Sequence, residues 1–159
     1  MNKIIFLLLS SIFLASCFDG SYADLNSEEK VSLKYRAIEK KFDNESEKPF
    51  ALFFYNSDCA ICSIQAPILE TLYKEKGFRF YAILGDKFDR NEALKYKKGM
   101  SFPIMYEKKA REYLGKVVGG IFGVPVIYFY DKNGIFDRRF LGLASAELLN
   151  AQINKLNAQ

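Results

Sequence analysis

Two cysteines separated by two residues are the part of this sequence best suited to chemistry. Cys59 and Cys62 enclose Ala60-Ile61, and residues 50–55, shortly before them, form an unbroken apolar run. A helix that begins at the first cysteine would turn unpaired backbone amides and the positive end of its dipole toward that sulfur, which favours a thiolate. The second sulfur, one turn later, is close enough to form a disulfide with the first. The pair predicts thiol–disulfide exchange, with Cys59 as the nucleophile and Cys62 as the resolving thiol.

Two other interpretations of the pair are weaker. A zinc site needs about four ligands, whereas the sequence has no histidine and three cysteines in all. A purely structural disulfide across so short a loop would add little stability by chain-entropy reasoning. The lack of histidine also excludes Ser-His-Asp and Cys-His catalysis and the ligation of haem by histidine. We therefore expect no metal, and no cofactor other than the redox-active disulfide itself.

The third cysteine, Cys17, ends an apolar leader. Residues 4–14 are mostly apolar but too few to span a bilayer, which takes about 20 residues. Residues 1–16 are therefore expected to be a cleaved lipoprotein signal peptide. The tetrapeptide Leu14-Ala15-Ser16-Cys17 resembles the bacterial lipobox, whose cysteine becomes the lipid-modified first residue of the mature protein.

This interpretation implies an anchored protein on the periplasmic side of the bacterial cell envelope. Residues 17–26 would form a short tether, and residues 27–159 would form the folded domain. The alternative is cleavage near Ala23, after the small-x-small pattern Ser21-Tyr22-Ala23, which would release a soluble periplasmic protein.

Hydrophobic periodicity predicts the elements that position the cysteine pair. A first helix is expected at 27–42, with Asn26 and Glu29 as a capping box. The apolar run at 50–55 is typical of a strand buried on both faces. The helix that carries the cysteines is expected to end near Gly77 and to bury Ile61, Ile64, Ile68 and Leu72.

The second half of the chain predicts a mixed sheet. Further strands are expected at 78–84, 102–105 and 126–130, with helices at 91–97 and 108–117. Asn133-Gly134 between two strand-like runs is a strong hairpin signal. A last helix should begin near Ser145. Strands alternating with helices and ending in a hairpin indicate an α/β fold, with a mixed central sheet flanked by helices.

Three stretches of the sequence, taken in order, resemble the thioredoxin superfamily, and most closely its membrane-anchored TlpA/ResA-like branch. Residues 59–67 resemble the branch's C-x-x-C-x-x-E-x-P pattern. Residues 123–134 resemble its G-V-P, strand and D-x-x-G block, and residues 138–148 resemble its closing strand and helix. The resemblance covers residues 48–156. It implies a thioredoxin-like fold and a protein-disulfide oxidoreductase.

The resemblance also implies roles for residues near the cysteines. Pro125 would follow a cis peptide bond beside them, and the backbone of Val124 would pair with an extended substrate segment. Pro67 would kink the active-site helix, because an interior proline removes a helical hydrogen bond. The alternatives are a trans proline that opens a strand at 125, and a helix that begins only after Pro67.

Two residues depart from the family pattern and would tune the thiols. Asp58 stands where the family usually has a tryptophan, and Gln65 stands in place of the glutamate. Gln65 removes a titrating carboxylate that can raise a thiol pKa, whereas Asp58 adds a negative charge beside Cys59. The two changes act in opposite directions, and their net effect does not follow from the sequence.

By the same resemblance, the protein would reduce disulfides of exported proteins, with apocytochrome c before haem attachment as the best-known target. A membrane thiol reductase would supply its electrons. A dithiol oxidase or isomerase would carry the same motifs. A peroxiredoxin-like peroxidase would need other residues at Leu52 and Asn56, and a copper chaperone normally uses histidine. A non-catalytic binding module would tolerate loss of both thiols.

The charge pattern adds one exclusion. A net charge of +4, from 23 basic and 19 acidic residues, predicts no nucleic-acid binding. The basic clusters at 95–98 and 108–111 are expected to be solvated helix faces, or alternatively to steer an acidic partner.

Overall fold

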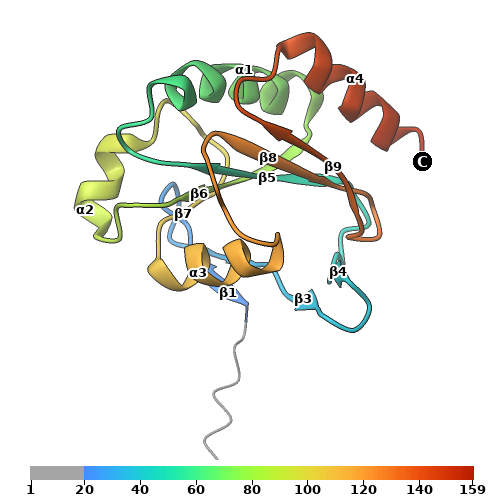
Figure 1. Ribbon diagram of the computed structural model, residues 1–159, viewed down its shortest axis with the longest axis horizontal. Coiled ribbons are helices and arrows are strands. Elements are labelled where there is room, and N and C mark those ends of the chain that lie inside the picture. The colour runs from blue at the N-terminus through green and yellow to red at the C-terminus, as the bar shows by residue number, and fades with distance from the viewer. Residues whose placement is uncertain (1–19) are drawn as a thin grey trace, which may run out of the picture.

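A five-stranded sheet forms the centre of the computed structural model, which describes residues 20–159 (Figure 1). Its strand order is β7-β6-β5-β8-β9. The strands β5, β6 and β7 run parallel, whereas β8 and β9 are antiparallel additions on the other side of β5. This topology confirms the mixed sheet and the closing hairpin. The bounds are Phe50–Tyr55 for β5, Arg79–Leu84 for β6, Ile104–Met105 for β7, Val126–Tyr130 for β8 and Phe136–Leu141 for β9.

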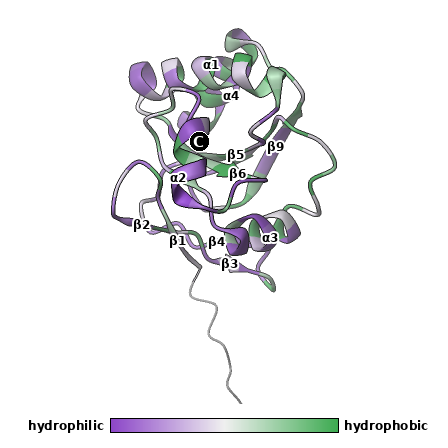
Figure 2. Ribbon diagram, turned by 90° about the vertical axis from the view of Figure 1, so that its left-hand side faces the viewer, coloured by the Kyte–Doolittle hydropathy of each residue, from purple (hydrophilic) through white to green (hydrophobic). Residues whose placement is uncertain are grey.

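Helices cover both faces of the sheet. The helices α1 (Ala60–Lys76) and α4 (Ala146–Asn157) lie on one face, and α3 (Lys108–Val117) lies on the other (Figure 1). All six residues of β5 are buried. Because successive side chains of a strand point to opposite faces, β5 supplies both core layers. Figure 2 shows β5 and β6 as hydrophobic strands between the two helical layers. The prediction of a strand buried on both faces is confirmed.

Helix α1 begins at the first cysteine and ends at a glycine, as the sequence predicts. Cys59 is its N-cap, and Gly77 at φ 61° closes it by donating its N–H to the carbonyl of Tyr73. The predicted buried face, however, is wrong by about one residue, because Ile61 and Ile64 are exposed. The prediction is confirmed for Leu72. The rest of the buried face carries Leu69 and four smaller or polar side chains, which a search for large apolar residues overlooks; these four are Cys62, Gln65, Ala66 and Glu70.

The helix predicted at 27–42 is wrong, because that segment forms two small hairpins. The strand β1 (Ser21–Ala23) pairs with β2 (Lys30–Ser32), and β3 (Tyr35–Arg36) pairs with β4 (Lys41–Phe42). The predicted capping box is absent there; Asn26 instead donates its side-chain amide to the carbonyls of Met100 and Phe102.

Long-range pairing explains this error. The backbone N–H of Leu33 donates to Gly20, and that of Phe42 donates to Gly134. The carboxylate of Asp24 accepts from the backbone N–H of Ile104. Such distant contacts outweigh weak helix propensity. Val31, Leu33 and Tyr35 do alternate with polar residues, which was the period-two signal for strands.

The predicted tether is also shorter than expected. Tyr22 and Leu25 are fully buried, so residues 20–26 belong to the packed domain. The expected signal peptide at 1–16 and the expected lipid-bearing Cys17 lie outside the described residues. Within residues 20–159, no helix combines the length and the apolar character that crossing a membrane requires.

The remaining elements agree with the sequence. Helix α2 (Arg90–Ala93) continues into a short 3₁₀ helix, Leu94–Tyr96, near the predicted 91–97. The β8–β9 hairpin turns at Gly134 at φ 79°, where a Cβ atom would collide with the backbone of Phe42. Ser145 caps α4 by accepting from the N–H of Leu148.

Candidate active site

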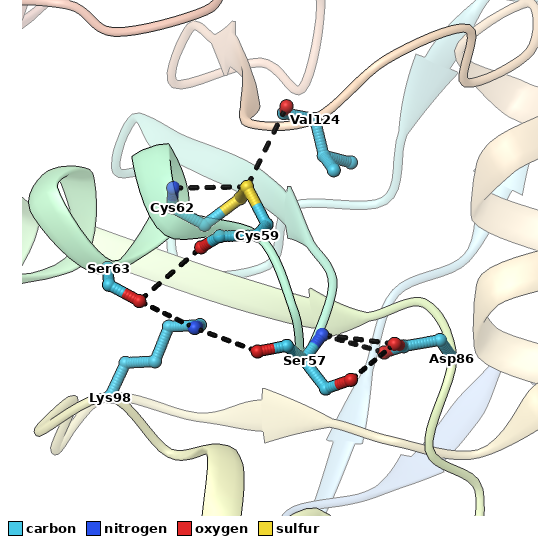
Figure 3. The surroundings of a disulfide bond; sticks show 7 residues. All are labelled: Ser57, Cys59, Cys62, Ser63, Asp86, Lys98 and Val124. Atoms are coloured by element: carbon cyan, nitrogen blue, oxygen red, sulfur yellow. Dashed lines mark hydrogen bonds between the residues drawn. A yellow bond between two sulfur atoms is a disulfide. The ribbon is translucent and has the colours of Figure 1, made fainter.

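Cys59 and Cys62 form a disulfide at the amino end of α1, with an S–S distance of 2.10 Å (Figure 3). The N–H of Cys62 points at the Sγ atom of Cys59, 3.1 Å away, so this sulfur acts as the acceptor that caps the helix. An unpaired amide and the helix dipole both stabilise negative charge at that position. The geometry therefore favours a thiolate at Cys59 once the disulfide is reduced.

The two sulfurs differ in their access to solvent. Cys62 is 0% exposed and belongs to the core beneath α1 and α4. Cys59 is only partly buried. A large partner can therefore meet Cys59 but not Cys62, which agrees with a nucleophile followed by a resolving thiol.

The loop that leads into β8 lies against this disulfide. The carbonyl oxygen of Val124 is 3.8 Å from the Sγ atom of Cys59, and in Figure 3 it points toward that sulfur. The Val124–Pro125 peptide bond is cis, as the resemblance implies. The chain thus brings together two segments that are 65 residues apart in sequence. The pairing of Val124 with a substrate backbone stays a prediction.

Gln65 lies buried one turn beyond Cys62 and is hydrogen-bonded to the backbone of a distant loop. Its side-chain oxygen accepts from the N–H of Ala144 at 2.8 Å, and its side-chain nitrogen donates to the carbonyl of Ala144 at 3.2 Å. Only an amide can satisfy both groups without a change of protonation, because an ionised carboxylate has no donor. Gln65 therefore joins α1 to the loop before α4.

Pro67 lies inside α1, so the alternative of a helix that begins after it is wrong. Its missing N–H leaves the carbonyl of Ser63 without the usual helical donor. The kink that the resemblance implies stays a prediction. Asp58, directly before the N-cap, is exposed to solvent.

A polar network surrounds the entry to α1 and was not predicted from the sequence (Figure 3). Ser57 donates both its backbone N–H and its hydroxyl to the carboxylate of Asp86. The ammonium of Lys98 donates to the carbonyl of Ser57 and to the hydroxyl of Ser63. Asp86 follows β6 and Ser57 follows β5. The sequence did contain a signal for this contact. Both residues follow predicted strands, and the carboxyl ends of neighbouring parallel strands meet at one edge of the sheet.

Tyr55 lies beneath this network at the end of β5. Its hydroxyl donates to the carbonyl of Tyr96. Burial, together with the negative charge of Asp86, raises the pKa of Tyr55 well above its ordinary value. The phenol is therefore a fixed neutral donor rather than a proton carrier at physiological pH.

Several apolar side chains on the first turns of α1, on the loop before β8 and at the end of β9 are exposed, and we call them the apolar rim. Ile61 lies between the two cysteines, and Phe122, which is 93% exposed, lies two residues before Val124. Leu141 packs beside Gly123 of the same loop. Contiguous exposed apolar surface is typical of protein-binding sites. The apolar rim comprises Ile61, Ile64, Phe122, Leu141 and Leu143.

Among residues 20–159, no group of three or more histidine, cysteine, aspartate or glutamate side chains is arranged to hold a metal ion.

Comparisons with known proteins agree with this geometry. The model of a family described as thioredoxin-like domain matches residues 36–157. A comparison with curated proteins finds no sequence relative.

Solved structures share the fold. A thiol:disulfide interchange protein of the thioredoxin family from Chlorobium tepidum is 20% identical with a TM-score of 0.65, covering 86% of this chain and 91% of its own. The exposed lipoprotein thioredoxin Etrx1 from Streptococcus pneumoniae is 18% identical with a TM-score of 0.65, covering 86% and 98%. StoA from Bacillus subtilis is 17% identical with a TM-score of 0.61, covering 82% and 92%.

Proposed function

Because the chain belongs to the family of thioredoxin-like domains, we propose that it is an exported, lipid-anchored reductase of protein disulfides. The observation that carries this proposal is the asymmetric pair at the start of α1, with Cys59 accessible and Cys62 buried. The substrate class is the disulfides of exported proteins. Apocytochrome c awaiting haem attachment is the member of that class that the resemblance favours.

The chemistry is a two-electron exchange in two displacement steps. The Cys59 thiolate attacks one sulfur of the substrate disulfide, forms a mixed disulfide and releases the other substrate sulfur as a thiolate. Cys62 then loses its proton to solvent and attacks the sulfur of Cys59. This step closes the Cys59–Cys62 disulfide and releases the second substrate thiolate. The substrate gains two electrons, and a membrane thiol reductase restores the dithiol of the protein.

The groups near the pair support moderate rather than extreme oxidising power. Strongly oxidising members of this chemistry owe their potential to a highly stabilised thiolate. No histidine lies between the cysteines here, and Asp58 places a negative charge next to Cys59. Both features limit the stabilisation of the thiolate and so favour donation of electrons.

A protein substrate fits the surroundings of Cys59. The apolar rim offers the exposed side chains of Ile61, between the two cysteines, and of Phe122, on the loop that leads to Val124. Burying one such side chain is worth about 1.5–3 kcal/mol, which corresponds to roughly a tenfold or greater gain in affinity. A small disulfide such as oxidised glutathione would cover little of this surface.

The N-terminal hairpin bears on the choice of cleavage site. Cleavage after Ala23 would remove β1 and with it the fully buried Tyr22. Cleavage before Cys17 would leave β1 intact, with residues 18–20 as the only link to the lipid. The hairpin therefore supports the lipoprotein over the soluble form. Mass spectrometry of the mature protein tests this: a chain that begins at an acylated Cys17 is expected, and one that begins at Asp24 contradicts it.

Trapping experiments test the reaction. A Cys62→Ser variant should accumulate mixed disulfides with exported proteins, whereas a Cys59→Ser variant should not. In cells without the protein, the trapped partners should accumulate oxidised. If the partners instead accumulate in the reduced form, the protein is a dithiol oxidase and the reductase proposal is wrong.

The apolar rim has its own test. Phe122→Ser should lower kcat/KM about tenfold for a protein disulfide, and leave the rate with oxidised glutathione unchanged. Ile38→Ser is the matched control, because Ile38 is 98% exposed on the distant β3–β4 turn. Equal effects of the two changes would show that the rim does not bind the substrate.

A further inference from the structure

One ammonium group is fixed at the entry to the active-site helix. Lys98 follows the 3₁₀ helix Leu94–Tyr96, and its Nζ atom donates to the hydroxyl of Ser63 at 2.8 Å. The same Nζ atom donates to the carbonyl of Ser57 at 3.2 Å. These two acceptors stand two residues before and four residues after Cys59 (Figure 3). Ser63 in turn donates to the carbonyl of Cys59, so a chain of hydrogen bonds leads from the ammonium to the nucleophilic residue.

The backbone holds Lys98 in an uncommon conformation. Its φ angle is 50°, in the left-handed region that residues other than glycine adopt at a cost of about 1 kcal/mol. Gly99 follows at φ 76°, and the N–H of Met100 closes the turn on the carbonyl of Lys97. Unfavourable backbone geometry of this kind persists where the surrounding structure enforces it, and it gathers at functional sites. Lys95 is exposed on the same segment, as expected of a solvated basic cluster, but Lys98 is not.

The charges near the start of α1 show what this ammonium does. Asp58 adjoins the N-cap, and Asp86 binds the N–H and hydroxyl of Ser57. The first turn of α1 contains no acidic residue. Two carboxylates thus oppose a thiolate at Cys59, and Lys98 is a cation hydrogen-bonded to both sides of the same turn. The guanidinium of Arg111, on α3, lies beside Gly85 and the side chain of Asn56.

We infer that Lys98 is a positioning residue for the redox couple: its fixed ammonium offsets Asp58 and Asp86, and so favours the Cys59 thiolate in the reduced protein. The inference rests on the proposed dithiol chemistry but not on the direction of electron flow. Its ordinary structural role would be to tie the segment before Met100 to α1, and that role alone would leave the thiol unchanged.

The expected effect has a definite sign. Without the ammonium, the thiolate is less stable and the pKa of the Cys59 thiol rises. A rise of about 0.5 to 1 unit lowers the thiolate fraction about three- to tenfold at a pH below the pKa. The reduced form also becomes less stable relative to the disulfide. At a pH above the raised pKa, where the reduced protein is mostly thiolate, the equilibrium constant with glutathione shifts by the same factor, or about 15 to 30 mV toward a more reducing potential. At a pH below the parent pKa the potential should hardly change.

The test compares four variants of the reduced protein. Lys98→Met and Lys98→Gly both remove the ammonium, but the glycine also relieves the left-handed backbone. Lys98→Arg keeps a cation, and Lys95→Met removes an exposed cation from the same segment. The readouts are the pH dependence of Cys59 alkylation and the equilibrium with glutathione, with thermal unfolding as the check on the fold.

We expect Lys98→Met and Lys98→Gly to raise the pKa of the Cys59 thiol alike, Lys98→Arg to restore it, and Lys95→Met to leave it near the parent value. The inference is overturned if Lys98→Met behaves as Lys95→Met does. It is equally overturned if Lys98→Gly keeps the parent pKa, since the backbone rather than the charge would then matter. Absence of any thiol exchange in the parent protein would instead refute the proposed function.

Discussion

Replacing Gln65 with glutamate tests how tightly the active-site helix is locked to the loop before α4. Gln65 is 0% exposed and exchanges two hydrogen bonds with the backbone of Ala144. An ionised carboxylate would keep the bond from the Ala144 N–H. It would also face the Ala144 carbonyl with no proton to share, leaving a buried acceptor unpaired at a cost of about 1–3 kcal/mol. The protonated acid can donate to that carbonyl. We therefore expect Gln65→Glu to be tolerated at low pH.

The size of the expected stability loss follows from the raised pKa of the new carboxyl group. Buried glutamates with a pKa of about 8 or 9 are known, against about 4.3 in an unfolded chain. A rise of two to three units corresponds to about 3–4 kcal/mol. Between the two pKa values the native state binds more protons than the unfolded state, so stability falls as the pH rises. Below the unfolded pKa the penalty is absent, and above the folded pKa it is constant.

The assay is urea unfolding of the oxidised protein from pH 4 to pH 9, for the parent, Gln65→Glu and Gln65→Met. The methionine loses both hydrogen bonds without adding a charge, so its deficit should not depend on pH. The glutamate variant should lie near the parent at pH 4 and lose about 3–4 kcal/mol by pH 9. A glutamate deficit that is the same at both ends of the range would refute this account of Gln65. Above its own pKa, the carboxylate should also raise the pKa of the Cys59 thiol.

Two further predictions concern stability away from the cysteines. Burial alone would raise the pKa of Glu70, but hydrogen bonds from Ser101 and Lys74 outweigh burial and lower it. The contribution of Glu70 to folding stability is therefore present at a pH above the ordinary pKa of a glutamate. It is lost as the pH falls through the lowered pKa of Glu70 in the folded protein. Glu70→Gln should remove that acid-dependent loss in urea titrations, and an unchanged pH slope would contradict it. Tyr22→Ala should cost about 3–5 kcal/mol of unfolding free energy because β1 is part of the core. Ile38→Ala is the control, and equal midpoints for the two would contradict a structural role for β1.

Local sequence signals sufficed for the elements that carry the chemistry. The apolar run of β5, the cysteine at the N-cap of α1 and Gly77 at its end each specify structure within a few residues. The Asn-Gly turn before β9 does the same. Because Cys59 sits where a strand ends and a helix begins, its position and its chemistry follow from adjacent residues. The resemblance added the cis bond before Pro125, which no local pattern of charge or periodicity indicates.

Contacts between residues far apart in the sequence could not be predicted in this way. The segment at 27–42 pairs with Gly20, Gly134 and Ile135 instead of forming a helix, and no residue within the segment indicates those partners. The inward face of α1 was misjudged because Cys62 and Gln65 are less obviously core residues than Ile61 and Ile64. The sequence places Lys98 in a solvated basic cluster. Its hydrogen bonds to Ser57 and Ser63 could not be predicted, because they depend on a left-handed turn that a lysine rarely adopts.

The departures of Asp58 and Gln65 from the family pattern have different physical weights. Asp58 is exposed, so water and salt screen its effect on Cys59. Gln65 is buried and uncharged, and its amide bonds both the N–H and the carbonyl of Ala144. It therefore places no titrating group in the interior, and it still holds the helix to the loop before α4. Other influences on Cys59 are the helix amides, the carbonyl of Val124, the carboxylate of Asp86, which acts through Ser57, and the ammonium of Lys98. Among these the amides are common to any helix that begins with a cysteine. Lys98 is a charged side chain rather than part of the helix itself, so a change there should alter the redox couple while the fold stays intact.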